Sequence, residues 1–249
     1  MAGKEVDVQQ TVAQIVKSDY RTADVFRKHG IEFCCGGNRS LALACEARGL
    51  DTLLVVEELQ RVHQGITIPA NIFAEDWNIH FLTDYITNVH HQYLKNSFAP
   101  AAEYLQRFVD GHANKYPSLP ELHRVFKELM SEMIPHLREE EEIIFPYIRQ
   151  IADAYYNNEP YARLLVRTLR KPVEKFLHAE HQSVLASLAT IRKLTDNYTP
   201  PPNACLNHQV CFLKLREIDL DLIQHLHLET DILFPKAIQM EKELLQKEA

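Results

Sequence analysis

Two copies of one short motif, 89 residues apart, constrain this chain of 249 residues more than any other feature of its sequence. The first copy, "HLREEEEIIFP", begins at His136, and the second, "HLHLETDILFP", begins at His225. Both fit the frame H-x-x-x-E-x-x-x-x-F-P, which selects Glu140 from a run of four glutamates and Glu229 from the second copy. Residues four apart share one face of an α-helix, so each copy predicts a helix that presents an imidazole and a carboxylate together.

Isolated histidines upstream extend the duplication. His90 lies 46 residues before His136, and His181 lies 44 residues before His225. Each half is therefore interpreted as a helical hairpin, with one isolated histidine on its first helix and the histidine–glutamate pair on its second. Two such hairpins predict an antiparallel four-helix bundle. Glycine usage agrees, because none of the seven glycines lies beyond Gly111, which favours long helices over hairpin turns.

Shorter helices are expected before the bundle. The stretches "TADVFRKHG", "SLALACEARG" and "DTLLVVEELQRVHQG" each open on a capping residue and close on glycine. The segment "ITIPANIFAED" follows them and has no helical period. We therefore predict an all-α fold with three parts: a small helical domain at 1–68, a linker at 69–75, and the antiparallel four-helix bundle at 76–249.

Composition narrows the functional classes. The formal net charge of −7 argues against nucleic-acid binding, because neutralising phosphates requires a basic face. The first residues lack an apolar signal core, and no apolar run is long enough to span a bilayer. We therefore expect a cytoplasmic protein that binds neither nucleic acid nor membrane. The odd number of cysteines, five, favours reduced thiols over a disulfide framework.

The candidate ligands lie in apolar stripes. His90, for example, has Ile86 and Leu94 four residues to either side, which predicts that it faces the core. A buried, unpaired carboxylate costs several kcal/mol, so Glu140 and Glu229 need compensating partners. Imidazole with carboxylate suits iron, manganese or zinc, and carboxylates can bridge a pair of metal ions. We predict two iron ions held by the following residues: His90, His136, Glu140, His181, His225 and Glu229.

Other residues near the motifs receive simpler interpretations. A lone histidine on an apolar face is usually a packing residue, and only the joint, repeated pattern favours metal binding here. His91 has Thr87 and Lys95 four residues to either side, so we expect it to point outward. The remaining glutamates of the acidic run are interpreted as a solvated face: Glu139, Glu141 and Glu142.

A pair of adjacent cysteines, Cys34 and Cys35, precedes two glycines in "IEFCCGGNRS". A disulfide between adjacent residues demands a strained backbone, so two free thiols are expected. The glycines permit a tight turn that exposes both sulfur atoms. We interpret the pair as a soft ligand or redox group, with burial as small apolar side chains as the alternative.

Together these motifs resemble a known family. The segment "DYRTADVFRKHGIEFCCGGNRSLALAC" resembles the N-terminal domain of the di-iron proteins that repair iron–sulfur clusters, the repair-of-iron-centres family, and the duplicated motif resembles their hemerythrin-like bundle. The resemblance implies that the six residues above are the di-iron ligands and that Cys34 and Cys35 are the family's vicinal cysteines. It also implies a cytoplasmic protein, often a homodimer, whose partners are iron–sulfur proteins damaged by nitric oxide or oxidants.

Oxygen-carrying hemerythrins are a poorer match. Their third helix has His-x-x-x-His, where this chain has Leu185 in the second position, and their last motif ends in Asp, where this chain has Thr230. Fewer protein ligands suit reactive or releasable iron better than reversible oxygen storage. The leading hypothesis is therefore a repair protein that supplies iron to damaged clusters or reacts at them.

Other functions stay open at the level of the sequence. One alternative is a redox catalyst of the nitric oxide reductase type, acting at the metal pair. Another is a binding module that senses oxygen or nitric oxide as a small ligand, although no signalling domain is evident in the chain. The simplest alternative is a helical scaffold without metal.

Overall fold

The computed structural model describes residues 6–33, 37–63, 74–168 and 179–246. Within these residues the elements are helices, with one isolated β-bridge between Thr11 and Ser40. Contacts divide the chain into a first unit of residues 1–70 and 199–214, and a second unit of residues 71–198 and 215–249. The predicted all-α fold is confirmed. Most of the predicted linker lies outside the described residues, as do Cys34 and Cys35.

The first unit has four short helices: α1 (Val12–Ser18), α2 (Thr22–Lys28), α3 (Leu41–Glu46) and α4 (Thr52–His63). Ser40 caps α3 by accepting a hydrogen bond from the backbone N–H of Leu43 at 3.4 Å. Gly30 and Gly49 follow α2 and α3 with φ of +65° and +64°, the left-handed conformation in which glycine ends a helix without strain. The sequence predicted both glycine stops.

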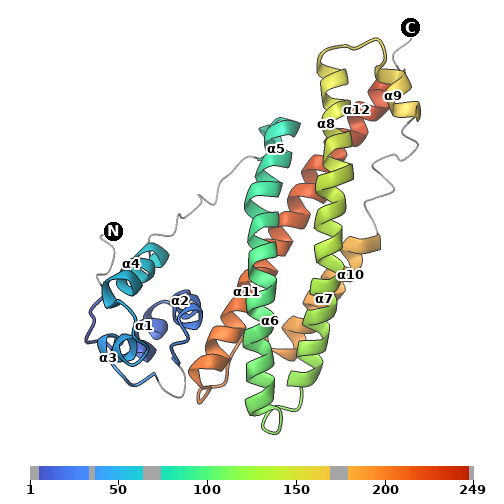
Figure 1. Cartoon of the computed structure of the whole chain (residues 1–249). Helices are drawn as coiled ribbons and strands as arrows, with labels where there is room; N and C mark the ends of the chain where they lie inside the picture. Colours follow the sequence, from blue (N-terminus) through green and yellow to red (C-terminus); the bar gives the residue numbers. More distant parts are fainter. Residues whose placement is uncertain (1–5, 34–36, 64–73, 169–178, 247–249) are drawn as a thin grey trace. The chain divides into compact units, whose positions relative to one another are not determined.

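Four long helical stretches follow (Figure 1); they belong to the second unit except for residues 206–214, which are grouped with the first. A 3₁₀ turn (Ala74–Asp76) precedes them. The first comprises α5 (Ile79–Tyr85), the π-helix η2 (Ile86–His91) and α6 (Gln92–His112). The second comprises α7 (Leu119–Glu139), the π-helix η3 (Glu140–Ile144) and α8 (Phe145–Tyr156). The third comprises α9 (Ala162–Thr168) and α10 (Ala179–Leu194), and the residues between them, 169–178, lie outside the described part of the chain. The fourth comprises α11 (Leu206–His227), the π-helix η5 (Leu228–Leu233) and α12 (Phe234–Gln246).

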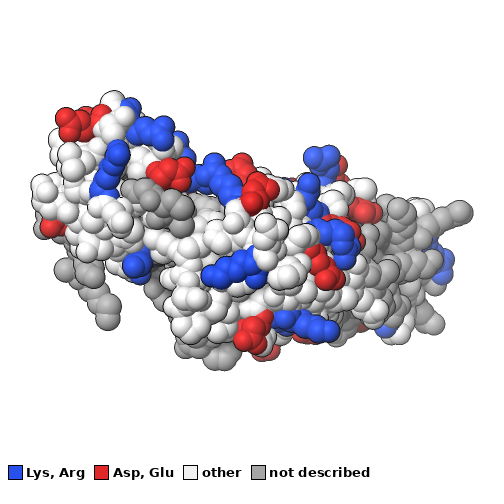
Figure 2. Space-filling view, turned by 90° about the horizontal axis from the view of Figure 1, so that it is seen from below, with Lys and Arg blue, Asp and Glu red and all other residues white. Residues whose placement is uncertain are grey.

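Packing of the four stretches makes the predicted bundle. α7 contacts both α6 and α10, and α8 contacts both α5 and α12. Apolar side chains fill the interior on either side of the bundle's middle, with Ile148 and Phe234 at one end and Phe98 and Phe126 at the other. Within the described residues, no helix is both long enough and apolar enough to cross a membrane. On the face drawn in Figure 2, basic and acidic side chains are interspersed over the described surface.

The two Phe-Pro pairs of the motif each follow a π-helix. Pro146 and Pro235 are the second residues of α8 and α12, directly after η3 and η5. Proline cannot donate a backbone hydrogen bond, and its ring clashes with the carbonyl four residues earlier in a regular α-helix. A wider π turn before each proline is one way to accommodate it, and such turns are frequent at functional sites.

A buried ion pair joins the last turns of α10 to α11. Asp219, 3% exposed, accepts hydrogen bonds from Arg192 Nε at 2.6 Å and from the Tyr198 hydroxyl at 2.6 Å. Tyr198 ends a run of three residues with positive φ, an uncommon conformation for a bulky side chain. Its buried hydroxyl, held by Asp219, fixes this turn in place.

We expect Asp219→Ala to destabilise the bundle, because it leaves the buried Tyr198 hydroxyl and the Arg192 guanidinium without their acceptor. The expected loss is about 2–3 kcal/mol, below the full cost of breaking a buried pair because Arg192 reaches solvent. Urea unfolding followed by circular dichroism measures it. The control is Asp84→Ala, which removes an exposed pair with Arg149 and is expected to cost under about 1 kcal/mol. Equal effects of the two substitutions would contradict this interpretation.

Candidate metal centre

Two carboxylates lie at the centre of the bundle with no exposure to solvent. Glu140 begins η3 and Glu229 lies in η5, and the side chain of each is 0% exposed. Within the described residues, none of their four carboxylate oxygens has a hydrogen-bond partner. Buried carboxylates are nearly always paired or bound to metal, so this arrangement has the character of a cation site.

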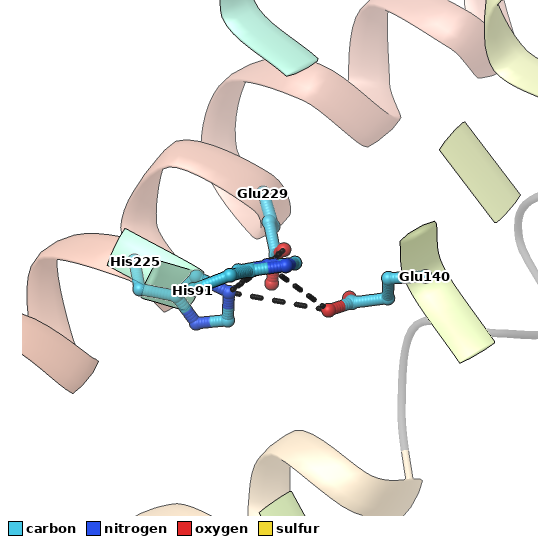
Figure 3. A group of neighbouring side chains, drawn as sticks. All are labelled: His91, Glu140, His225 and Glu229. Atoms are coloured by element: carbon cyan, nitrogen blue, oxygen red, sulfur yellow. Dashed lines mark hydrogen bonds and ion pairs between the residues drawn. The ribbon is translucent and has the colours of Figure 1, made fainter. Parts of the chain in front are cut away.

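Two groups of side chains share these carboxylates, and within each group the possible ligand atoms lie within 4.8 Å of one another. The first group, drawn in Figure 3, consists of His91, His225, Glu140 and Glu229. The second group consists of His136, His181, Glu140 and Glu229. In Figure 3, Glu140 reaches across from one helical stretch toward the three other side chains of the first group.

Each carboxylate offers one oxygen to each group. Glu140 Oε2 lies 3.5 Å from His91 Nε2, while its Oε1 lies 3.2 Å from His136 Nε2. Likewise Glu229 Oε1 lies 3.0 Å from His225 Nε2, while its Oε2 lies 3.6 Å from His181 Nε2. This is the arrangement in which two carboxylates can bridge a pair of cations with two imidazoles on each.

The prediction that His91 points outward is wrong. Its side chain is 0% exposed, and its Nε2 atom lies 3.0 Å from Nε2 of His225, inside the first group. His90 is also buried, but neither group includes it. Its Nδ1 atom is 3.0 Å from Asp221 Oδ1, and its Nε2 atom has no hydrogen-bond partner among the described residues.

The π-helix η2 explains why His91 is buried in the first group, contrary to the prediction. Before it, the buried stripe runs from Leu82 to Ile86 and then reaches His90, with the four-residue spacing of an α-helix. After it, buried Leu94 and Phe98 lie three and seven residues beyond His91. A π turn holds one extra residue, so the adjacent side chains of His90 and His91 can both be buried within it. The prediction assumed an unbroken α-helix, and on that assumption His91 was expected to point outward.

A sequence signal for His91 existed in the repeat itself. His91 and His181 are 90 residues apart, whereas His90 and His181 are 91 apart. The copies of the motif are 89 residues apart, so His91 fits the duplication more closely.

The phenylalanines of the motif pack on the site. Phe145 stacks on His91 with ring centroids 5.5 Å apart, and Phe234 stacks on His181 at 6.2 Å. Both rings are almost fully buried. Glutamate and phenylalanine have the same spacing in both copies, and each copy thus packs a phenylalanine ring against one histidine of a group.

Burial and neighbouring charges give the two carboxylates different pKa values. Burial, together with the charge of Glu229, raises the pKa of Glu140 above its usual range. Burial acts in the same direction on Glu229, but His225 and His91 outweigh it and hold the pKa of Glu229 well below its usual value. Of the two carboxylates, Glu140 therefore binds a proton more readily than Glu229.

Glu141 is not part of a solvated face, contrary to the prediction. It is 2.9 Å from His91 Nδ1 and accepts hydrogen bonds from Lys95 Nζ at 2.7 and 2.6 Å. Burial would raise its pKa, but the hydrogen bonds from Lys95 and His91 lower it, so Glu141 is a carboxylate that orients a histidine of the site. On the other group, His181 Nδ1 is 3.1 Å from Thr230 Oγ1.

Buried imidazoles around two shared carboxylates, inside a four-helix bundle, define a cation-binding helical protein. Residues 83–237 match the hemerythrin HHE cation-binding domain, and the chain belongs to this family. Residues 8–63 match ScdA_N, a domain of unknown function (DUF542).

Relatives share both parts. The chain is 27% identical to the iron-sulfur cluster repair protein ScdA of Staphylococcus epidermidis over 229 residues, which cover 92% of this chain and 97% of that protein. It is 26% identical to ScdA of Staphylococcus haemolyticus over 231 residues, with 92% and 97% covered. It is 27% identical to the iron-sulfur cluster repair protein YtfE of Yersinia pseudotuberculosis over 225 residues, with 89% and 93% covered. The predicted resemblance to cluster-repair proteins is confirmed.

The neighbours His90 and His91 allow a direct test of the site. We expect His91→Gln to lower the number of iron ions bound per chain, because it removes an imidazole from the first group. His90→Gln changes a histidine that neither group includes, and we expect it to keep the metal content of the original chain. Metal analysis after anaerobic reconstitution measures both. Loss of iron in His90→Gln, together with full binding in His91→Gln, would reverse the assignment.

Proposed function

We propose that this protein holds two iron ions in its shared carboxylate site and repairs iron–sulfur clusters damaged by nitrosative or oxidative stress. One observation carries the proposal: each of two fully buried carboxylates offers one oxygen to each of two histidine pairs. Relatives named iron-sulfur cluster repair proteins match about nine-tenths of the chain, which supports the same function.

The residues fit iron on chemical grounds. Imidazole and carboxylate are ligands that non-haem iron prefers, and two cations would offset the cost of burying two carboxylates. Bound iron would supply coordination positions that can exchange ligands and electrons. We propose six protein ligands, in which His91 takes the place predicted for His90: His91, His136, Glu140, His181, His225 and Glu229.

The protein's own side chains would bind the ions and keep water away from them. The stacked rings of Phe145 and Phe234 shield one histidine of each group. Glu141 fixes the orientation of His91 through its hydrogen bond. These contacts preorganise the site on rigid helices, which suits repeated binding and release of a metal ion.

We further propose that the targets are iron–sulfur proteins in the cytoplasm whose clusters have lost iron or reacted with nitric oxide. The thiols of Cys34 and Cys35 would assist transfer as soft ligands. A homodimer would present two such thiol pairs to its targets.

Metal content per chain tests the site. Anaerobically purified protein is expected to contain close to two iron ions per chain, and Glu140→Gln with Glu229→Gln together should abolish binding, because both bridging carboxylates are then lost. Glu142→Gln, an exposed member of the same acidic run, serves as the control and should bind as the original chain does. A folded protein that takes up no iron would contradict the proposal.

Repair itself is tested with an iron–sulfur enzyme inactivated by nitric oxide. The iron-loaded protein is expected to restore its activity, and the variant with Glu140→Gln and Glu229→Gln is not, because it has no iron to supply or react with. The readout is recovered enzyme activity, with an equal concentration of free ferrous ion as the comparison. Equal recovery with the double variant would mean that the carboxylate site has no part in repair.

A further inference from the structure

The two copies of the motif correspond residue by residue, and one correspondence breaks the symmetry of the site. An offset of 89 residues pairs Glu140 with Glu229, and it also pairs Glu141 with Thr230. Glu141 lies 2.9 Å from Nδ1 of His91, and Thr230 lies 3.1 Å from Nδ1 of His181. Equivalent positions therefore hold equivalent histidines, one through a carboxylate and the other through a hydroxyl.

The carboxylate of Glu141 allows only one tautomer of His91. An ionised carboxylate has no proton to donate, so Nδ1 of His91 must carry the hydrogen of this bond. The Nε2 atom of His91 then presents its lone pair toward Glu140 Oε2, 3.5 Å away. Lys95 donates two hydrogen bonds to Glu141, which holds the carboxylate in this position. His91 is thus preorganised as a metal ligand, and a carboxylate partner raises its basicity.

Thr230 does not impose this choice on His181. A hydroxyl can accept a hydrogen bond from Nδ1, or it can donate one to Nδ1. In the second case the proton lies on Nε2, the atom that faces Glu229 Oε2 at 3.6 Å, and that tautomer cannot bind a cation there. The neutral hydroxyl also makes a weaker hydrogen bond than a carboxylate does.

The exposure of the histidine side chains also differs between the two groups. The side chains of His91 and His225 are 0% exposed, whereas those of His136 and His181 are each 7% exposed. The second group is therefore slightly more exposed to solvent than the first. Both this slight exposure and the hydroxyl, rather than carboxylate, partner of His181 favour faster release of a bound ion.

We propose that the two metal positions are inequivalent: the group with His91 and His225 retains its ion, and the group with His136 and His181 holds the ion that is released. This inference rests on the proposed two-iron site and deepens it, because it names the ion that would be supplied to a damaged cluster. Glu141 acts as a positioning residue for the retained ion, and Thr230 occupies the equivalent place for the released one.

Release of ferrous iron to a colorimetric chelator tests this inference. Protein loaded anaerobically with ferrous iron is analysed for total metal, mixed with excess chelator, and followed by absorbance. Two phases of about one ion each are expected. His181→Gln should remove the fast phase and His91→Gln the slow one, which assigns each phase to its group.

Exchanging the two outer residues is the decisive step. Glu141→Thr should accelerate the slow phase by about 10–100-fold and leave the fast phase unchanged. Thr230→Glu should slow the fast phase, and the variant with both substitutions should invert which ion leaves first. Glu141→Gln keeps the size of the side chain but removes its charge, so it should accelerate the slow phase without a change in packing. Glu142→Gln is the matched control and should alter neither phase.

Two different failures can be told apart. Fewer than two ions in the loaded protein would overturn the proposed site and this inference with it. Two ions that leave in a single phase, at a rate that Glu141→Thr and Thr230→Glu do not change, would overturn the inequivalence and leave the proposed function standing. Circular dichroism and thermal melting of each variant show that it is folded before release is measured.

Discussion

The rest of this structure depends on the burial of two carboxylates that have no hydrogen-bond partner among the described residues. Glu140 and Glu229 are both fully buried near the middle of the bundle, where two ionised groups would each cost several kcal/mol if left alone. Four imidazoles surround them, and apolar side chains fill the bundle on either side. Burial raises the pKa of Glu140, while His225 and His91 lower that of Glu229, so a bound cation would compensate charge that the protein otherwise holds in a buried environment.

Three of the candidate ligands lie in π-helices, where the helical stretches depart from regular α-helix. Glu140, Glu229 and His91 each lie in a π segment, and the third helical stretch contributes His181 from α10. A π turn replaces the regular hydrogen bonds of the α-helix with wider ones, and such turns are rare and frequently lie at functional sites. Two of the three precede a Phe-Pro pair, so the proline and the metal ligand belong to the same local departure from the α-helix.

Duplication of the motif accounts for the near symmetry of the site. The two halves differ at the pair of equivalent positions Glu141 and Thr230. The candidate ligands and the stacked phenylalanines repeat between the halves, which yields two similar groups of possible metal ligands around shared carboxylates. Glu141 and Thr230 occupy equivalent places behind them but differ in charge and in the tautomers they allow. Similar candidate ligands that are oriented by different residues fit the proposal that one ion is retained while the other is released.

Local spacing alone determined the all-α fold, the four long helical stretches and the pairing of His136 with Glu140 and of His225 with Glu229, because residues four apart on a helix share a face whatever surrounds them. Only the tertiary structure shows that His91, and not His90, lies beside the shared carboxylates, because that position depends on a π turn and on the packing of the neighbouring helices. It also decided the role of Glu141, which the sequence placed among solvated glutamates. The partners of that carboxylate, His91 and Lys95, lie 50 and 46 residues away and meet it only when the helices pack.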